Sequence, residues 1–487
     1  MRRTLLVTVL AGLALGAAPP TDRLADVYGP PVARVVGAAL TSAGAYETLA
    51  HLTDVIGPRL SGSRGAEEAV RWTSERLRKD GLVVRTEALM VPRWERGREW
   101  GRIIAPAEHA LALVALGGSV ATSAEGLEAE VVEAVGLEGL ARLPPEDVRG
   151  RIVLFNAPMQ GPDAGKAYLA AAPQRTRGPV EAARLGAVGV LVRSLGTLSA
   201  RLPHTGQTRY VEGVPPVPAA ALSAEDADLI HRLLERGTPV RVRFHLGARL
   251  LPDVPSANVV ADLPGRERKE EIVLIAAHLD SWDLGTGALD DGAGVAMVME
   301  SLRLLKSLGL NPRRTVRGVL YMNEENGMKG GAGYAQAHAA ELARHVAALE
   351  ADTGAGPALG LTARVGPGGA ATLGSILSLL APIGAGRLVE SGTGGADITP
   401  LGGAGVPLLG LDLDYSRYFD WHHTAGDTLD KVDPRALAQA TATMAAVAYV
   451  LADMPEPLAR AAPLQSPTPT PLPSPTPPPP LTASPRP

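Results

Sequence analysis

Residues 271–294 read EIVLIAAHLDSWDLGTGALDDGAG, an apolar run followed directly by a histidine and four aspartates. A short apolar run without polar alternation is typical of a strand that is buried on both faces of a parallel sheet. Carboxylates this close in sequence repel one another, so a folded chain keeps them together only if they are solvated, paired with cations or bound to metal. The stretch therefore predicts a charged site at the end of a buried strand.

The sequence around this stretch alternates between strand and helix patterns. Apolar periodicity predicts helices at 293–310 and 333–345. Short apolar runs predict strands at 258–264, 271–280, 315–326, 346–354 and 406–414. Strands separated by helices of this length indicate an α/β fold, which we expect to be a three-layer αβα sandwich around a mixed, largely parallel central sheet.

Metal-binding side chains cluster where these predicted strands end. Ligand sites of α/β sheets lie at the carboxyl edge of the strands, so residues that follow successive strands are expected to meet there. A lone histidine or acidic pair in such a loop is usually only solvated, but here two imidazoles and three carboxylates occur together. This set suits two zinc ions that lack thiolate ligands. The candidate ligands are His278, Asp290, Glu325, Asp352 and His423.

Other motifs in the chain do not indicate a site. HAAELARH at 338–345 resembles a helical zinc motif but lacks the second histidine at the required spacing. We therefore expect His338, Glu341 and His345 to lie on a solvated helix face. GTGALD lacks the third glycine of a dinucleotide-binding loop, and the chain contains neither a GxSxG motif nor a phosphate-binding loop.

The chain divides into several regions by composition. We expect the catalytic domain to comprise 19–100 and 251–455, with helices at 33–57 and 66–81 and a strand at 82–91. Between these parts, residues 101–250 contain short valine-rich pieces separated by Gly and Pro turns and lack a His/Asp/Glu cluster. This pattern predicts an inserted β-rich domain.

Overall composition excludes several classes of function. The 487 residues are 46% hydrophobic but only 3% aromatic, with a formal net charge of -4 and no basic cluster. Nucleic acids and anionic membrane surfaces are therefore not expected partners. The chain has no cysteine, which excludes disulfides and thiolate zinc sites.

Both ends of the chain differ from the rest. Residues 1–18 have two arginines, an apolar stretch and small residues, which is the layout of a signal peptide cleaved near Ala18. The apolar stretch is short for a membrane span, so we expect a secreted, periplasmic or envelope protein with no span after cleavage. Proline occupies 12 of the last 25 positions, and we expect 456–487 to form a disordered, proline-rich tail.

At these motifs the chain resembles the co-catalytic di-zinc exopeptidases of the zinc aminopeptidase type, and most closely the carboxypeptidase Q branch of that family. The similar segments follow the family order from about residue 40 to residue 455. In this light the inserted region, with DVRGRIVLFN and GPVEAARLGAVGVLVRS, resembles a protease-associated domain. The matching segments are HLDSWDLGTGALDDGAG (278–294), NEEN (323–326), LEADTG (349–354), SGTGGADITPLGGAGVP (391–407) and YFDWHHTAGDTLDKVDP (418–434).

The resemblance implies a role for each candidate ligand, with two Zn²⁺ per chain. His278 and Asp352 would hold one zinc, Glu325 and His423 the other, and Asp290 would bridge both. His423 rather than His422 is implied as the ligand by its distance from the family's Asp-Thr pair.

The resemblance also implies the catalytic groups around the ligands. Glu324 would be the general base, taking a proton from a water that lies between the two ions. Asp280 would orient the His278 imidazole, and Asp291 follows the bridging ligand as it does in the family.

The expected activity is hydrolysis of dipeptides or short peptides with free termini, by a chain that acts alone or as a homodimer. There are two alternatives on the same fold: a metal-free, receptor-like binding module and a single-zinc, glutaminyl cyclase-like enzyme. The number of metal ions per chain distinguishes these three functions. Trp282 and Trp421 could form walls of the substrate pocket or simply pack, and Asp397 could hold a substrate amine or cap a turn. The sequence leaves these choices open.

Overall fold

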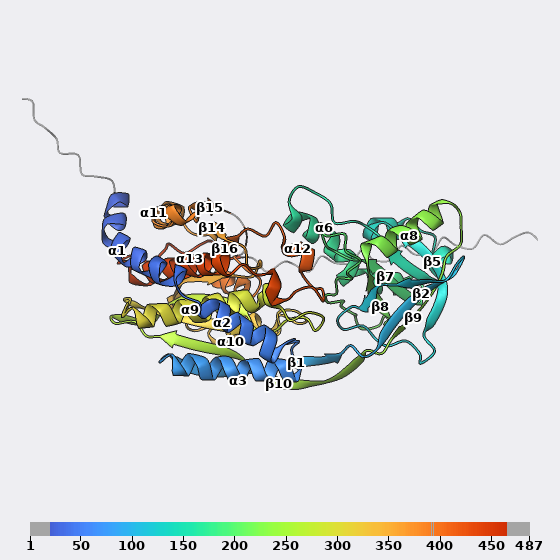
Figure 1. Ribbon diagram of the computed structural model, residues 1–487, viewed down its shortest axis with the longest axis horizontal. Coiled ribbons are helices and arrows are strands. Elements are labelled where there is room, and N and C mark those ends of the chain that lie inside the picture. Colours follow the sequence, from blue (N-terminus) through green and yellow to red (C-terminus); the bar gives the residue numbers. More distant parts are fainter. Residues whose placement is uncertain (1–19, 391, 393, 465–487) are drawn as a thin grey trace, which may run out of the picture.

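The computed structural model describes residues 20–390, 392 and 394–464. The predicted signal peptide lies outside these residues, as does most of the proline-rich tail. Two bodies lie side by side along the long axis of the molecule, and each is built on an eight-stranded sheet (Figure 1).

The first sheet is mixed and carries four parallel strands at its centre. Its strand order is β1-β10-β12-β11-β13-β16-β14-β15, and β12, β11, β13 and β16 run parallel to one another. The flanking pairs β10 with β12 and β14 with β16 are antiparallel. The strands are β1 (Val83–Glu95), β10 (Arg249–Leu263), β11 (Arg268–His278), β12 (Arg314–Tyr321), β13 (His345–Glu350), β14 (Ala358–Arg364), β15 (Arg387–Val389) and β16 (Leu408–Leu413).

Helices cover both faces of this sheet, which explains the unbroken apolar run in β11. Val273 and Ile275 belong to a large core with α9 and α13, whereas Leu274 and Ala276 pack in a second core with Tyr334 of α10. The predicted αβα sandwich is thereby confirmed. Its helices are α1 (Pro20–Leu40), α2 (Gly44–Ala50), α3 (Arg64–Lys79), α9 (Ala293–Ser307), α10 (Lys329–Ala337), α11 (Gly369–Ser378) and α13 (Pro434–Asp453).

The second body is a β-rich unit with its own core. Its sheet has the order β3-β2-β9-β5-β6-β7-β8-β4, in which β5 to β8 run parallel. Helices that the valine-rich pattern did not predict pack around it, namely α6 (Ala164–Thr176), α7 (Gly178–Arg184) and α8 (Ala224–Glu235). The strands are β2 (Glu99–Ala105), β3 (His109–Leu111), β4 (Leu113–Ala115), β5 (Leu127–Ala134), β6 (Ile152–Phe155), β7 (Gly189–Arg193), β8 (Ala219–Leu222) and β9 (Arg241–Leu246).

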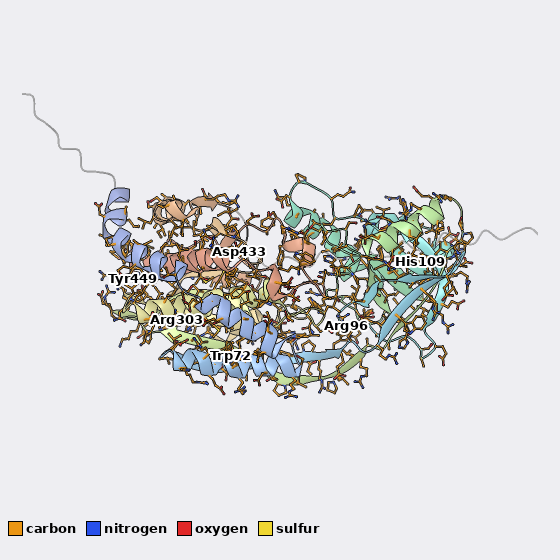
Figure 2. The ribbon with its side chains drawn as sticks, viewed as in Figure 1. Trp72, Arg96, His109, Arg303, Asp433 and Tyr449 are labelled. Atoms are coloured by element: carbon orange, nitrogen blue, oxygen red, sulfur yellow. The ribbon has the colours of Figure 1, made fainter. Side chains whose placement is uncertain are left out.

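The long strands β1 and β10 connect the two bodies. They form one antiparallel ladder from Val83 to Glu95, and their far ends reach the second body (Figure 1). Arg96 follows β1 and lies between the bodies (Figure 2). Its guanidinium donates to the Asp283 carboxylate at 2.6 and 2.9 Å and to the Ala115 carbonyl at 2.6 Å. An ion pair therefore ties the loop after β11 to the second sheet.

Trp282, from the same loop, packs into the second body. Its side chain is buried in the core that contains Trp94 and Phe244. A Cβ atom at Gly117 would lie only 1.9 Å from the indole ring, so that position has no room for a side chain. Trp282 is thus a packing residue that links the two bodies, although its ring also meets the His423 ring edge-on at 5.8 Å.

The prediction of a solvated helix at 333–345 is wrong. Helix α10 ends at Ala337, and a turn followed by a short 3-10 helix (Leu342–Arg344) leads into β13. His345 is fully buried at the start of that strand, where its Nε2 lies 2.9 Å from the Tyr334 hydroxyl. Burial lowers the pKa of His345 to about 4, so this residue is a neutral core histidine.

The predicted start of the disordered tail is also wrong, because residues 456–464 pack on the body that contains the first sheet. Leu458 and Ala461 are buried, and the backbone N–H of Leu464 donates to the Gly402 carbonyl at 2.9 Å. Arg460 donates to carbonyls that include those of Leu342 and Ala404. Apolar side chains and an arginine thus order this segment before the proline-rich sequence begins.

Within the described residues, α13 alone is long and apolar enough to span a membrane. Of its most apolar window, 89% is buried inside the protein. Its side chains belong to the large core together with α9 and β11. The hydrophobicity of α13 is therefore that of a central core helix.

Candidate metal centre

The parallel strands β12, β11 and β13 place three ligand-bearing loops at one edge of the sheet. His278 ends β11 and pairs in register with Tyr321, the last residue of β12, and Ala276 pairs with Glu350, the last residue of β13. Glu325 and Asp352 follow β12 and β13 within a few residues. Asp290 comes from the turn Ala288–Gly292, whose backbone is not helical at Asp290 itself, and His423 comes from the loop after α12 (Tyr418–Trp421).

The first group of ligand atoms consists of His278, Asp290 and Asp352. The Nε2 atom of His278 lies 3.1 Å from Oδ1 of Asp290 and 3.4 Å from Oδ1 of Asp352. All three ligand atoms lie within 4.8 Å of one another. One imidazole and two carboxylates at this spacing can surround a single cation.

The second group lies on the other side of the Asp290 carboxylate. The Nε2 atom of His423 is 3.2 Å from Oδ2 of Asp290 and 3.1 Å from Oε2 of Glu325. Oδ2 of Asp290 is buried and has no hydrogen-bond donor among the described residues. The structure thus brings all five candidate ligands together, with one Asp290 oxygen facing each group. Two imidazoles and three carboxylates in this arrangement fit two zinc ions without thiolates.

His422 lies close to the same group. Its Nε2 atom is 3.5 Å from Oδ2 of Asp290, and its ring stacks on that of His423 at 3.6 Å. The two histidines differ in what holds them: Nδ1 of His423 donates to the Thr205 carbonyl at 3.3 Å, whereas Nδ1 of His422 has no partner among the described residues. A carbonyl oxygen can only accept a hydrogen bond, so the proton of the neutral His423 imidazole lies on Nδ1. The lone pair of Nε2 is then free to bind a metal.

The Asp280 side chain does not orient the His278 imidazole, as the sequence predicted, but has another role. Nδ1 of His278 donates to the backbone carbonyl of Asp280 at 3.0 Å, while the Asp280 carboxylate is 3.9 Å away from it. The carboxylate instead accepts backbone N–H groups of Asn323 at 2.8 Å and Glu324 at 3.0 Å, and of Glu325 at 3.3 Å. The Asp280 side chain therefore positions the Glu324–Glu325 doublet rather than the imidazole.

Asp291 and Asp427 hold the loop that carries the bridging carboxylate. Asp291 accepts the backbone N–H of His278 at 3.1 Å. Asp427 accepts those of Leu289 at 2.7 Å and Asp290 at 3.2 Å. These bonds fix the backbone on both sides of the metal site, so the two acids act on the ligands through main-chain contacts.

Arg59 is a supporting residue that sequence reasoning missed. Its buried guanidinium donates to backbone carbonyls of Leu279 at 2.9 Å, Thr286 at 2.7 Å and Gly287 at 2.9 Å. It thereby ties both ends of the loop between His278 and Asp290, and its positive charge lies near four buried carboxylates. No local pattern marks Arg59, because these three carbonyls lie more than 200 positions away in the sequence.

Glu324 faces a cavity beside the two ligand groups. The cavity has a volume of about 450 Å³ and is also lined by Asp290, Asp352 and His423. Burial raises the pKa of Glu324 well above its usual range, and the neighbouring carboxylates of Asp352 and Glu325 raise it further. Glu324 belongs to neither group of ligand atoms, so its carboxyl group is available for proton transfer.

Known proteins that are similar to this chain are peptidases, which agrees with the geometry of the candidate metal ligands. The model of peptidase family M28 matches residues 258–448, which contain every candidate ligand. Carboxypeptidase Q from Mus musculus is 39% identical over 416 residues, covering 85% of this chain and 87% of that protein. Carboxypeptidase Q from Homo sapiens is also 39% identical and covers 85% and 86%.

Solved structures agree with this relationship. The crystal structure of a peptidase M28 precursor from Shewanella amazonensis SB2B has a TM-score of 0.88 at 40% identity, covering 90% of this chain and all of that one. The zinc aminopeptidase BSAP from Bacillus subtilis has a TM-score of 0.62 at 21% identity, covering 84% and 95%, and shares the fold. The family resemblance of the motifs is thereby confirmed. The chain belongs to peptidase family M28 and is a zinc-dependent exopeptidase similar to carboxypeptidase Q.

Proposed function

We propose that this exopeptidase binds two zinc ions per chain and hydrolyses dipeptides or short peptides with free termini. The observation that carries the proposal is the position of Asp290, whose two carboxylate oxygens face two separate His-carboxylate groups. A carboxylate shared by two such groups would hold two ions close together, as a two-metal hydrolytic site needs. Glu324 beside these groups supplies the proton-accepting side chain that a binding module does not need.

The chain's own residues divide the work of hydrolysis. His278 and Asp352 would hold one ion, Glu325 and His423 the other, and Asp290 would contact both. When bound, the ions supply Lewis acidity, which activates a water and polarises the scissile carbonyl.

Glu324 would carry the proton through the reaction. Its carboxylate accepts the proton of the attacking water and then gives it to the leaving amine nitrogen. The Asp280 carboxylate accepts the backbone N–H of Glu324 at 3.0 Å and that of Glu325 at 3.3 Å, which fixes the main chain that carries both side chains. Glu325 would hold a metal ion with its carboxylate oxygens, which leaves Glu324 as the member of the pair that can accept a proton.

The position of the cavity supports small substrates. Its walls come from both bodies: Tyr168 belongs to α6 of the second body and Phe419 to α12 of the body that carries the metal ligands. The ring centroids of these two residues lie 5.1 Å apart. Ligand pockets have volumes of about 300–1,000 Å³. The volume of this cavity, about 450 Å³, lies in the lower part of that range. A short peptide fits in this space, whereas a folded protein would be blocked by the second body.

Comparing one dipeptide in its free form with the same dipeptide acetylated and amidated tests the proposal. We expect kcat/KM to fall by about 10⁴-fold when both ends are blocked, because buried polar groups that pair with a substrate terminus are left without a partner. A folded protein of similar sequence content should not be cleaved. Equal kcat/KM values for the free and the doubly blocked peptide would reject exopeptidase action.

A further inference from the structure

The two groups of candidate ligands are anchored by different parts of the molecule. In the first group, Nδ1 of His278 at the end of β11 donates to the Asp280 carbonyl at 3.0 Å. Asp352 follows β13 by two positions, and the N–H of Ala351 before it donates to the Ala276 carbonyl at 3.1 Å. All of these contacts lie within the body that contains the first sheet.

His423, in the second group, is held by a loop of the second body. Thr205 lies between β7 and β8, and its N–H donates to the His423 carbonyl at 2.9 Å. Its carbonyl accepts Nδ1 of the same histidine at 3.3 Å. In the same loop, the Thr197 N–H donates to the Phe419 carbonyl at 3.2 Å and the Thr197 hydroxyl to the Asp420 carboxylate at 2.7 Å. The segment that carries His423 is therefore bound to the second body at two places.

Glu325, which belongs to the second group alone, also depends on the second body. Its Oε1 atom accepts the backbone N–H of Trp282 at 3.2 Å, and the Trp282 indole is buried in the core of the second body. The carbonyl of Asn326, the next residue, accepts the Gln207 side chain at 2.9 Å. Gln207 is two positions after Thr205, so one loop contacts the chain beside both ligands.

Arg96 lies where the two bodies meet and connects these contacts (Figure 2). Its side chain is only 10% exposed. Nη2 donates to the Thr205 hydroxyl at 3.3 Å and to the Asp283 carboxylate at 2.6 Å. Nη1 donates to the Ala115 carbonyl at 2.6 Å, and the Thr205 hydroxyl donates to that carbonyl at 2.9 Å. Because Asp283 follows Trp282, one guanidinium holds both points through which the second body reaches the second group.

We propose that Arg96 is a positioning residue through which the second body sets the zinc affinity of the second site, formed by Asp290, Glu325 and His423. The inference rests on the proposed two-zinc function and adds what controls the occupancy of one site. Loss of the contacts that orient a ligand typically weakens metal binding by about 10- to 100-fold. The first site, formed by His278, Asp290 and Asp352, does not depend on Arg96. The second body is then a part of the metal centre as well as a cover over the cavity.

The experiment measures both zinc dissociation constants of the full chain by equilibrium dialysis against buffered free zinc. In Arg96→Met the second site should bind zinc about 10- to 100-fold more weakly than in the wild type, while the first site stays within about twofold. At a free-zinc concentration that just fills both wild-type sites, this variant should therefore hold about one zinc per chain.

Two ligand variants show which of the two sites is affected. Asp352→Ala removes a ligand of the first site, and adding Arg96→Met to it should weaken the remaining zinc by about 10- to 100-fold. His423→Ala removes a ligand of the second site, and adding Arg96→Met to it should change the remaining affinity by less than about twofold. A residue that acts on one site has an effect only in the variant that keeps that site.

Arg193→Met is the matched control for Arg96→Met. Arg193 is an arginine of the same body with 15% of its side chain exposed, and it also forms an ion pair, with Asp228. Among the described residues its guanidinium bonds only to Asn156 and Asp228, neither of which contacts a ligand. Both zinc affinities of Arg193→Met should stay within about twofold of the wild type.

Thr205→Val is a second and milder variant. It removes the hydroxyl that accepts Arg96 and keeps the size of the side chain and the carbonyl that binds His423. The second site should bind zinc about tenfold more weakly, and this variant decides the question if Arg96→Met does not fold.

The other outcomes separate the two proposals. A wild type that binds only one zinc rejects the proposed two-zinc function itself. Unchanged affinities in Arg96→Met, or equal losses at both sites, overturn the role of Arg96 and leave that function intact. An equal loss in Arg193→Met also overturns it, because the effect would then come from lower stability of the second body.

Discussion

Asp290→Ala should abolish peptide hydrolysis, lowering kcat/KM by at least about 10³-fold, and should remove both zinc ions from the purified chain. The reason is that the two Asp290 oxygens lie 3.1 Å from His278 Nε2 and 3.2 Å from His423 Nε2, so one side chain serves both groups. The prediction is checked by measuring the number of zinc ions per chain by elemental analysis and kcat/KM on the same sample.

A matched control for this variant is Asp253→Ala. Asp253 is exposed, and among the described residues its carboxylate pairs only with Lys329, so its loss should leave zinc content and activity within about twofold of the wild type. Full zinc occupancy in Asp290→Ala would contradict a bridging role for Asp290, as would loss of a single ion.

Glu324→Gln should lower kcat by about 10²- to 10⁴-fold while zinc content stays that of the wild type. Glutamine keeps the size of the side chain but cannot accept the proton, and the Asp280 carboxylate still holds the backbone at this position. The measurement is kcat at saturating dipeptide, with zinc determined on the same sample.

Glu325→Gln is the matched comparison, because it makes the same Glu-to-Gln replacement at the neighbouring position. Glu325 lies 3.1 Å from Nε2 of His423, so this variant should lose affinity for metal, and added zinc should restore part of its activity. Added zinc should not rescue Glu324→Gln. If Glu324→Gln turned over dipeptide at the wild-type rate with full zinc, Glu324 would not be the base.

The sheet and its ligands were predictable because their signals are local. An apolar strand followed by a polar loop marks both the buried strand and its carboxyl end, and parallel strands place such ends at one edge. His278, Glu325 and Asp352 follow successive parallel strands of this kind. The order β12-β11-β13 then brings together residues that lie far apart in the chain.

The contacts that hold the site could not be predicted in this way. Arg59 and the Thr205 carbonyl act on backbone or imidazole groups that lie hundreds of positions away, and neither leaves a pattern in the sequence. Asp280 has the spacing of an imidazole partner, but the structure turns its carboxylate toward the β12 loop. His345 was misplaced because a 3-10 turn ended the apparent helical periodicity just before a strand.

The number of zinc ions in the active enzyme is the most direct test of the account. Apoprotein prepared with a chelator should regain full dipeptide hydrolysis only as bound zinc approaches two per chain. A single-zinc, cyclase-like site would instead reach full activity at one ion, and a binding module would show none. Full activity at one zinc per chain, or in the absence of metal, would contradict a di-zinc centre bridged by Asp290.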